Sequence, residues 1–185
     1  MEIGNTLYVS TRAQWRAWLR RHHLTASEIW LVYYKKNSSK ARLPYNEAVE
    51  EALCFGWIDN ILKRIDEEKY AQRFTPRKPG SPWSAANRER YRRLVRLGRM
   101  TRAGREAYRH SHSNPKRTTE LPRDIVSAIR ADPVAWKYFC RFPSSYRRVR
   151  IGWIDGARKR PSVFRQRLAY FLRMTRQGRQ YGMIR

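Results

Sequence analysis

Apolar positions in the first third of the chain switch between strand-like and helix-like spacing. Residues 7–9 form a short apolar run, which indicates a first strand. A helix should follow, because Thr11 and Gln14 have the spacing of a capping box and apolar residues then recur at i, i+3, i+4 and i+7. Residues 28–36 are apolar on both alternating faces, which predicts a central strand.

The next segment predicts a helix followed by a β-hairpin. Pro44 opens the helix and Gly56 ends it. Three glutamates between them, early enough to suit the helix N-terminus, should form an acidic outer face. Residues 61–65 and 70–75 alternate between apolar and polar positions, so they predict two strands joined by a four-residue loop. The three glutamates are Glu47, Glu50 and Glu51.

From residue 81 onward the apolar spacing is helical. Ser81 is expected to cap a helix that has Pro82 at its first position and ends near Leu97. A shorter helix follows from Thr101, and the last third predicts four short helices, each opened by a proline. The tetrapeptide Gly-Trp-Ile-Asp ends a helix at 56–59 and recurs inside one at 152–155, and we interpret the recurrence as coincidence.

These elements predict an α+β fold, with a small antiparallel sheet and packed helices followed by a C-terminal helical subdomain. The polar, proline-containing stretch after the first helices indicates a linker. We therefore expect an α+β domain over residues 1–112, a linker over 113–120 and a helical domain over 121–185.

Charge is the strongest feature of the composition. The 185 residues include 41 Lys and Arg against 15 Asp and Glu, which gives a formal net charge of +26. Such a chain attracts nucleic acid or another polyanion. The alternative is that the arginine content reflects genome composition and that the surface is simply solvated. Composition leaves both interpretations open.

The sequence also predicts a compartment. No secretory signal is visible at the N-terminus, and no apolar run has the length of a membrane span. Cys54 and Cys140 both lie in apolar helical contexts, as buried thiols in a reducing compartment would. We therefore expect a cytoplasmic protein, and the sequence does not indicate its oligomeric state.

Motifs of enzyme chemistry are missing from the sequence. It has no Gly-rich phosphate loop, and no cysteine or acidic cluster accompanies His110 and His112 to complete a metal site. Cys54 has no histidine nearby in the sequence that would act as its base. We expect no catalytic residue, no metal and no cofactor, and favour a protein that is not an enzyme.

The bacterial YdeI/OmpD-associated proteins, also called the bacteriocin-protection family, resemble this chain over four segments: LPYNEAVEEALCFGWIDN (43–60), YAQRFTPRKPGSPWSAAN (70–87), LGRMTRAG (97–104) and PSSYRRVRIGWIDGARKR (143–160). The resemblance implies an α+β part followed by helices, and a role in tolerance of bacteriocins or envelope stress. After Ala157 the family usually shows a Thr-Arg pair, whereas this chain has Ser-Val-Phe-Arg at 162–165, which argues against a ligand site in the last helix.

The helix start near residue 81 is a candidate anion site. Arg77 and Lys78 precede the free N–H groups of a helix N-terminus, an arrangement that attracts phosphate or carboxylate. In the alternative that we favour, the tryptophans belong to the core and Arg77 pairs with Asp59. The candidate anion-binding residues are Asp59, Arg77, Lys78, Ser81, Ser84 and Asn87, with Trp57 and Trp83 as an aromatic wall.

Arginines at helical spacing are candidates for nucleic-acid binding: Arg88, Arg92, Arg96 and Arg99 on one helix, and Arg147 and Arg150 on another. They would bind mainly phosphates, with weak sequence preference and strong salt dependence. The leading hypothesis is a non-enzymatic protein that binds nucleic acid or another polyanion. One alternative is a small-anion receptor or enzyme with a pocket around the WIDN and TPRKPGSPWS motifs. Another is a protein-interaction module that presents its helical region to a protein partner.

Overall fold

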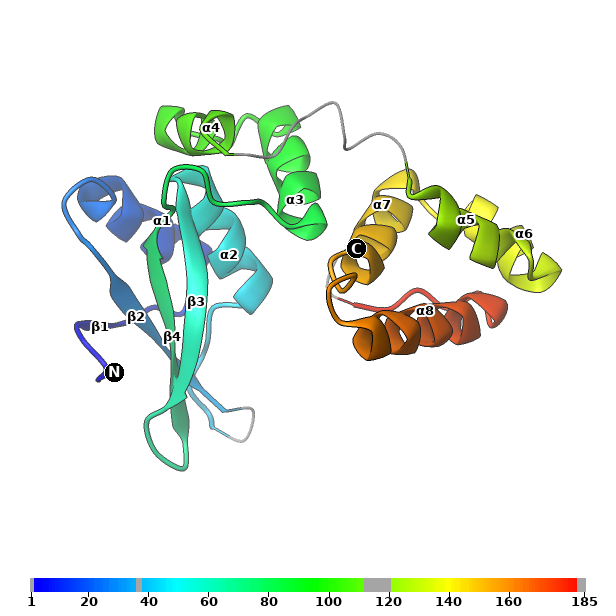
Figure 1. Ribbon diagram of the computed structural model, residues 1–185. Helices are drawn as coiled ribbons and strands as arrows, with labels where there is room; N and C mark the ends of the chain where they lie inside the picture. Colours follow the sequence, from blue (N-terminus) through cyan, green and yellow to red (C-terminus); the bar gives the residue numbers. More distant parts are fainter. Residues whose placement is uncertain (1, 36–37, 112–120, 183–185) are drawn as a thin grey trace. The chain divides into compact units, whose positions relative to one another are not determined.

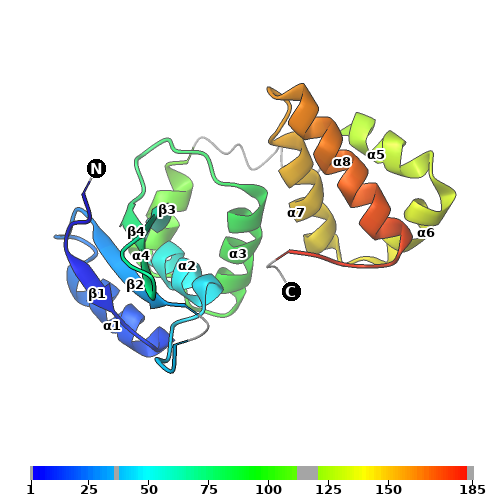
Figure 2. The same cartoon turned by 90° about the horizontal axis from the view of Figure 1, so that it is seen from below.

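The computed structural model describes residues 2–35, 38–111 and 121–182, and its ribbon is shown in Figures 1 and 2. The chain divides into two compact units: Met1–Ser81 with Arg90–His112, and Pro82–Glu89 with Ser113–Arg185. We call them the α+β unit and the helical unit. The predicted linker at 113–120 and His112 lie outside the described residues, so the domain boundary there stays a prediction.

A four-stranded sheet forms the centre of the α+β unit. Its strands are β1 (Thr6–Tyr8), β2 (Ile29–Tyr34), β3 (Trp57–Arg64) and β4 (Lys69–Pro76), in the spatial order β1-β2-β4-β3 (Figure 1). The predicted α+β class is confirmed, and β3 and β4 form the predicted antiparallel hairpin. The sheet is mixed rather than antiparallel throughout, because β1 and β2 are parallel. Parallel neighbours need a crossover connection, and helix α1 (Arg12–His22) supplies it.

Two helices pack together against this sheet. Helix α1 has the predicted capping box, in which Thr11 and Gln14 each satisfy a backbone N–H of the other. Its Trp15 is fully buried, donates Nε1–H to the carbonyl of Ala48 in α2 (Tyr45–Cys54) at 3.0 Å, and lies 5.4 Å, centroid to centroid, from Phe74 of β4. This one side chain therefore joins both helices to the sheet.

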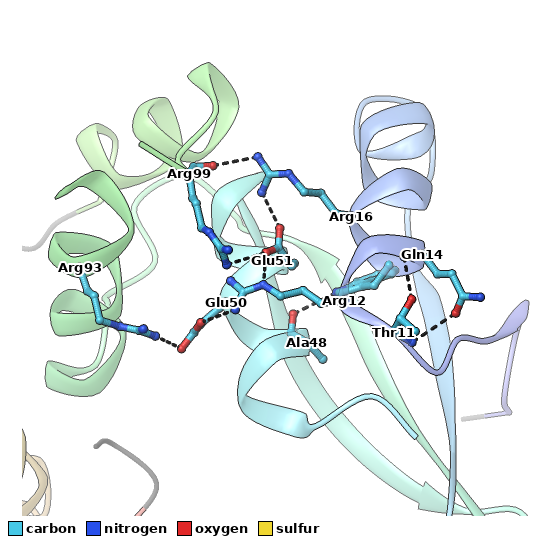
Figure 3. A network of polar contacts seen from close by, with 10 residues as sticks. Thr11, Arg12, Gln14, Arg16, Ala48, Glu50, Glu51, Arg93 and Arg99 are labelled. Atoms are coloured by element: carbon cyan, nitrogen blue, oxygen red, sulfur yellow. Dashed lines mark hydrogen bonds and ion pairs between the residues drawn. The ribbon is translucent and has the colours of Figure 1, made fainter. Parts of the chain in front are cut away.

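The glutamates of α2 do not form the predicted outer face. Glu50 and Glu51 are buried, with only 6% and 1% of their surface exposed. Figure 3 shows the reason: Arg12 and Arg16 of α1 and Arg93 reach over α2 and form ion pairs with the two carboxylates. Arginines distant in sequence thus cover a helix face that looks solvent-exposed by itself.

Helix α3 (Ala85–Arg96) belongs to both units, because Pro82–Glu89 groups with the helical unit and Arg90 onward with the α+β unit. It begins later than expected. The Ser84 hydroxyl, rather than that of Ser81, accepts the Asn87 N–H at 3.2 Å and so caps the first turn. The Ser-Pro-Trp-Ser sequence offers two capping serines, and the second one makes the cap. Helix α4 (Arg102–Arg109) follows, capped by Thr101 as predicted.

The four predicted C-terminal helices are all present in the helical unit: α5 (Arg123–Arg130), α6 (Pro133–Arg141), α7 (Ser144–Asp155) and α8 (Pro161–Arg176). Their core is aliphatic and aromatic, with Ile125, Phe139, Ile154 and Phe171 at its centre. Cys140 of α6 is exposed, so only Cys54 is a buried thiol as expected. Among the described residues no helix has the length and apolar character needed to cross a membrane.

Candidate anion-binding site

The helical unit contains a pocket of about 510 Å³ that brings together residues from three helices. The start of α3 lies on one side, and α7 and α8 form the other. Gly152 permits the close approach of α7 to α3, because a Cβ at this position would lie 2.4 Å from the Cβ of Ala85. The polar and aromatic residues that line the pocket are Trp83, Ser84, Arg88, Arg150, Trp153, Asp155 and Arg167.

Arg150 is the most unusual of these side chains. It is only 9% exposed, and its guanidinium lies over three aromatic rings, 4.9 Å from Tyr181, 5.6 Å from Tyr146 and 6.0 Å from Trp153. Its Nε is buried and has no hydrogen-bond partner. Within the described residues no carboxylate pairs with Arg150. A buried charge is costly unless it is paired, so this arginine is suited to receive an anion.

Arg167 of α8 is held in place by a neutral group. Its guanidinium lies 4.5 Å from the centroid of the Trp153 ring and donates to the Trp153 carbonyl at 2.5 Å. Arg88 of α3 donates to the carbonyl of Trp83 and has further interactions. A bond to a carbonyl fixes the position of a guanidinium without cancelling its charge. The arrangement therefore orients cationic groups at the pocket.

The N-terminus of α3 adds partial positive charge. Ser84 lines the pocket while its oxygen accepts the Asn87 N–H, so the first turn of the helix starts at the pocket. Free N–H groups and the helix dipole favour negative charge at such a position. The helix start and the buried Arg150 therefore favour the same kind of ligand.

Asp155 is the acidic residue of the pocket lining, and it carries its own partner. It forms an ion pair with Arg158, which also pairs with Asp124 at 2.8 Å. The hydrogen bond to Asp124, with that to Asp155, raises the pKa of Arg158, and the hydrogen bond from Arg158 lowers the pKa of Asp124. The lining therefore keeps an excess of positive charge, with three arginines against one aspartate.

The structure divides the predicted site residues between the two units. Four of them, from both predicted sets, meet at the pocket: Trp83, Ser84, Arg88 and Arg150. Asn87 stays close through its bond to Ser84, and Arg147 lies over the ring of Phe139 at 5.5 Å. The others belong to the α+β unit: Trp57, Asp59, Arg77, Lys78, Ser81, Arg92, Arg96 and Arg99.

In the α+β unit, Asp59 accepts a hydrogen bond from the Tyr45 hydroxyl at 2.5 Å. Burial lowers the pKa of Arg77, and the charge of Asp59 acts in the opposite direction. Trp57 is buried in the core, where its Nε1–H donates to the carbonyl of His23 at 3.1 Å. Trp57 is therefore a core residue and no part of the pocket.

Sequence reasoning missed three pocket residues. Trp153 and Asp155 come from the second Gly-Trp-Ile-Asp, whereas Trp57 and Asp59 of the first one lie outside the pocket, so the recurrence itself gives no sign of the site. Arg167 lies in the last helix, where the missing Thr-Arg pair argued against a ligand site, and the structure places it in the pocket lining.

A metal site and a cysteine nucleophile have little support among the described residues. They contain no group of three or more His, Cys, Asp or Glu side chains that would hold a metal ion. Burial raises the pKa of the Cys54 thiol to about 11, which keeps it protonated at neutral pH. Cys54 is therefore a poor nucleophile.

Comparison with protein families gives two adjoining matches. Residues 7–107 match the family described as Domain of unknown function (DUF8412), and residues 118–178 match Bacteriocin-protection, YdeI or OmpD-Associated. The resemblance at 143–160 is thereby confirmed, while the segments at 43–104 fall within the first match. No curated protein and no solved structure matches the chain. The chain therefore belongs to the DUF8412 family over residues 7–107 and carries a YdeI/OmpD-associated bacteriocin-protection domain over residues 118–178.

Proposed function

We propose that the helical unit binds a small organic anion in the pocket lined by Arg88, Arg150 and Arg167. The observation that carries the proposal is Arg150, a guanidinium 9% exposed that has aromatic neighbours and pairs with no carboxylate of residues 2–35, 38–111 and 121–182. Each aromatic face contributes about 0.5–2 kcal/mol to holding a cation. Burying an unpaired ion costs several kcal/mol, so the rings offset this cost only in part. A bound anion would supply the missing charge.

The pocket has the size and lining of a ligand site. Sites for small molecules typically measure roughly 300–1,000 Å³ and combine apolar or aromatic walls with a few polar groups. The volume of about 510 Å³, the walls formed by Trp83 and Trp153, and the arginines fit this description. A carboxylate or phosphate group would accept charge-assisted hydrogen bonds from the guanidiniums.

Thermal-shift and calorimetric titrations with phosphate, citrate and benzoate test the proposal. At least one of these anions should bind saturably to the wild type, and Arg150→Met should remove the binding. Arg173→Met is the matched control, because Arg173 also lies over an aromatic ring, Tyr170, at 5.2 Å but is not in the pocket lining. Absence of binding to the wild type, or equal binding to Arg150→Met, would refute the proposal.

A second candidate function is binding of a polyanion such as nucleic acid, and the charge of the helical unit favours it. Residues 121–182 contain 15 Arg and Lys against three acidic residues. The three acids, Asp124, Asp132 and Asp155, all pair with Arg158 or Arg176. Most of the positive charge therefore remains available for phosphates.

Fluorescence anisotropy with a labelled single-stranded oligonucleotide tests this second function. Affinity should fall steeply between about 50 and 200 mM salt, as expected when bound phosphates release counterions. Arg150→Met should leave it nearly unchanged, because Arg150 is buried. An affinity that is absent, or insensitive to salt, would count against polyanion binding.

The cellular role that we propose is tolerance of bacteriocins or related stress, supported by the description of the family matched at 118–178. Survival of a bacterial strain lacking this protein should fall on bacteriocin exposure and be restored by the wild-type gene. If the Arg150→Met variant restores survival to the same level, tolerance does not depend on anion binding in the pocket.

A further inference from the structure

The pocket is not uniformly cationic, because Asp155 lies in its lining beside three arginines. An acidic residue in an anion site weakens binding of a simple anion by repulsion. It also stands at the last position of α7, where the helix dipole disfavours negative charge. Asp155 is thus poorly placed for helix stability and for a ligand that carries negative charge alone.

Its position along α7 separates it from Arg150. Asp155 follows Arg150 by five residues, which corresponds to about 7.5 Å of helix rise. Both residues nevertheless line the same pocket. The pocket therefore presents groups of opposite charge at two separate places along one helix.

The ion pair with Arg158 does not use up the carboxylate of Asp155. Arg158 Nε donates to Oδ1 of Asp155, and the Asp155 side chain remains 40% exposed. A carboxylate has two oxygens and about four lone-pair positions, so further donors can bind to it. Asp155 thus keeps the capacity to accept a hydrogen bond from a ligand.

We infer that the ligand carries a hydrogen-bond donor, such as an ammonium group, several ångströms from its anionic group. This inference rests on the proposed anion binding and narrows it to one class, the aminocarboxylates and similar zwitterions. The anionic group pairs with Arg150, and the donor pairs with Asp155. Such a ligand turns the repulsion from Asp155 into an attraction.

The inference is tested with pairs of ligands that differ only in the presence of an amine. 6-Aminohexanoate and hexanoate have the same chain and carboxylate, and the shorter pair 4-aminobutanoate and butanoate varies the separation. For wild-type protein, 6-aminohexanoate should bind roughly tenfold more tightly than hexanoate, as one charge-assisted hydrogen bond provides. Asp155→Asn should reduce this preference to about twofold or less, and hexanoate should then bind no worse than before.

Asp124→Asn is the matched control. Asp124 also pairs with Arg158 but is not in the pocket lining, so this variant disturbs Arg158 and leaves Asp155 in place. It should retain the preference for 6-aminohexanoate. If Asp124→Asn abolishes the preference as Asp155→Asn does, Asp155 acts only through Arg158 and the inference is wrong.

Comparing the two ligands on wild-type protein tests the inference even if Asp155→Asn does not fold. Equal binding of 6-aminohexanoate and hexanoate would overturn the inference while leaving anion binding intact. Failure of every anion to bind would instead overturn the proposed function, and the inference with it. Tighter binding of the amino compound that persists in folded Asp155→Asn would also contradict the assignment of Asp155.

Discussion

Replacement of Glu51 by Gln tests the account of the α+β unit most severely. Glu51 is 1% exposed, pairs with Arg12, and accepts a bond from Arg16 at 2.5 Å. Arg99 lies further away, at 3.9 Å (Figure 3). Burial acts to lower the pKa of Arg12 and of Arg16, but hydrogen bonds and charges, those of Glu51 first, outweigh burial and raise both pKa values. Glutamine keeps the shape of the side chain and removes this charge.

The structure sets the size of the effect. Removing one partner of a buried ion pair costs about 3–5 kcal/mol, because the other charge stays buried without compensation. The side chains of Arg12 and Arg16 are 24% and 28% exposed, so water screens part of their charge. We therefore expect Glu51→Gln to lower the free energy of unfolding by about 2–4 kcal/mol.

Urea unfolding followed by circular dichroism measures this loss, and hydrogen exchange in α2 locates it. Glu47→Gln is the matched control, since Glu47 lies on the same helix and is only partly buried. It should change the free energy of unfolding by less than about 1 kcal/mol. If Glu51→Gln matches Glu47→Gln, the glutamates do not stabilise this unit as buried partners of arginine.

Three further predictions concern the rest of the molecule. Gly152→Ala would place a Cβ 2.4 Å from Ala85, so it should cost about 1–3 kcal/mol and weaken anion binding, while Ala85→Gly in the same chain should restore both. The backbone N–H of Ala135 and then Arg176 lower the pKa of Asp132 below 3.8, so its contribution to stability is present above pH 3.8 and is lost as pH falls through the lower folded value. The melting temperature of Asp132→Asn should therefore fall less on acidification than that of the wild type. Cys140 is exposed and Cys54 is buried, so a thiol reagent should modify only Cys140 quickly in native protein, and equal rates for both would contradict the buried position of Cys54.

Local sequence signals predicted most of the elements. Thr11 with Gln14 and Thr101 cap helices as expected, because capping depends on residues within one turn. The parallel pairing of β1 with β2 was not predicted, since short strands give no signal of their direction.

Burial and the site depend on residues far apart in sequence. Glu50 and Glu51 share with Glu47 the spacing of a solvent-facing stripe, and only the folded chain places arginines from two other helices over them. The pocket likewise joins the start of α3 to residues more than sixty positions later. A charge pattern indicates that arginines are abundant, but not that Arg150 is buried in the folded chain beneath aromatic rings.

Arg150 is the residue on which the proposed anion binding depends most directly. Isothermal titration of 6-aminohexanoate into the wild type, Arg150→Met and Arg173→Met measures this in one experiment. We predict saturable binding to the wild type and to Arg173→Met, with at least about a tenfold loss for Arg150→Met, because a buried charged hydrogen bond is removed. Equal affinity in all three proteins, or no binding to any of them when phosphate, citrate, benzoate and hexanoate also fail to bind, would contradict the account.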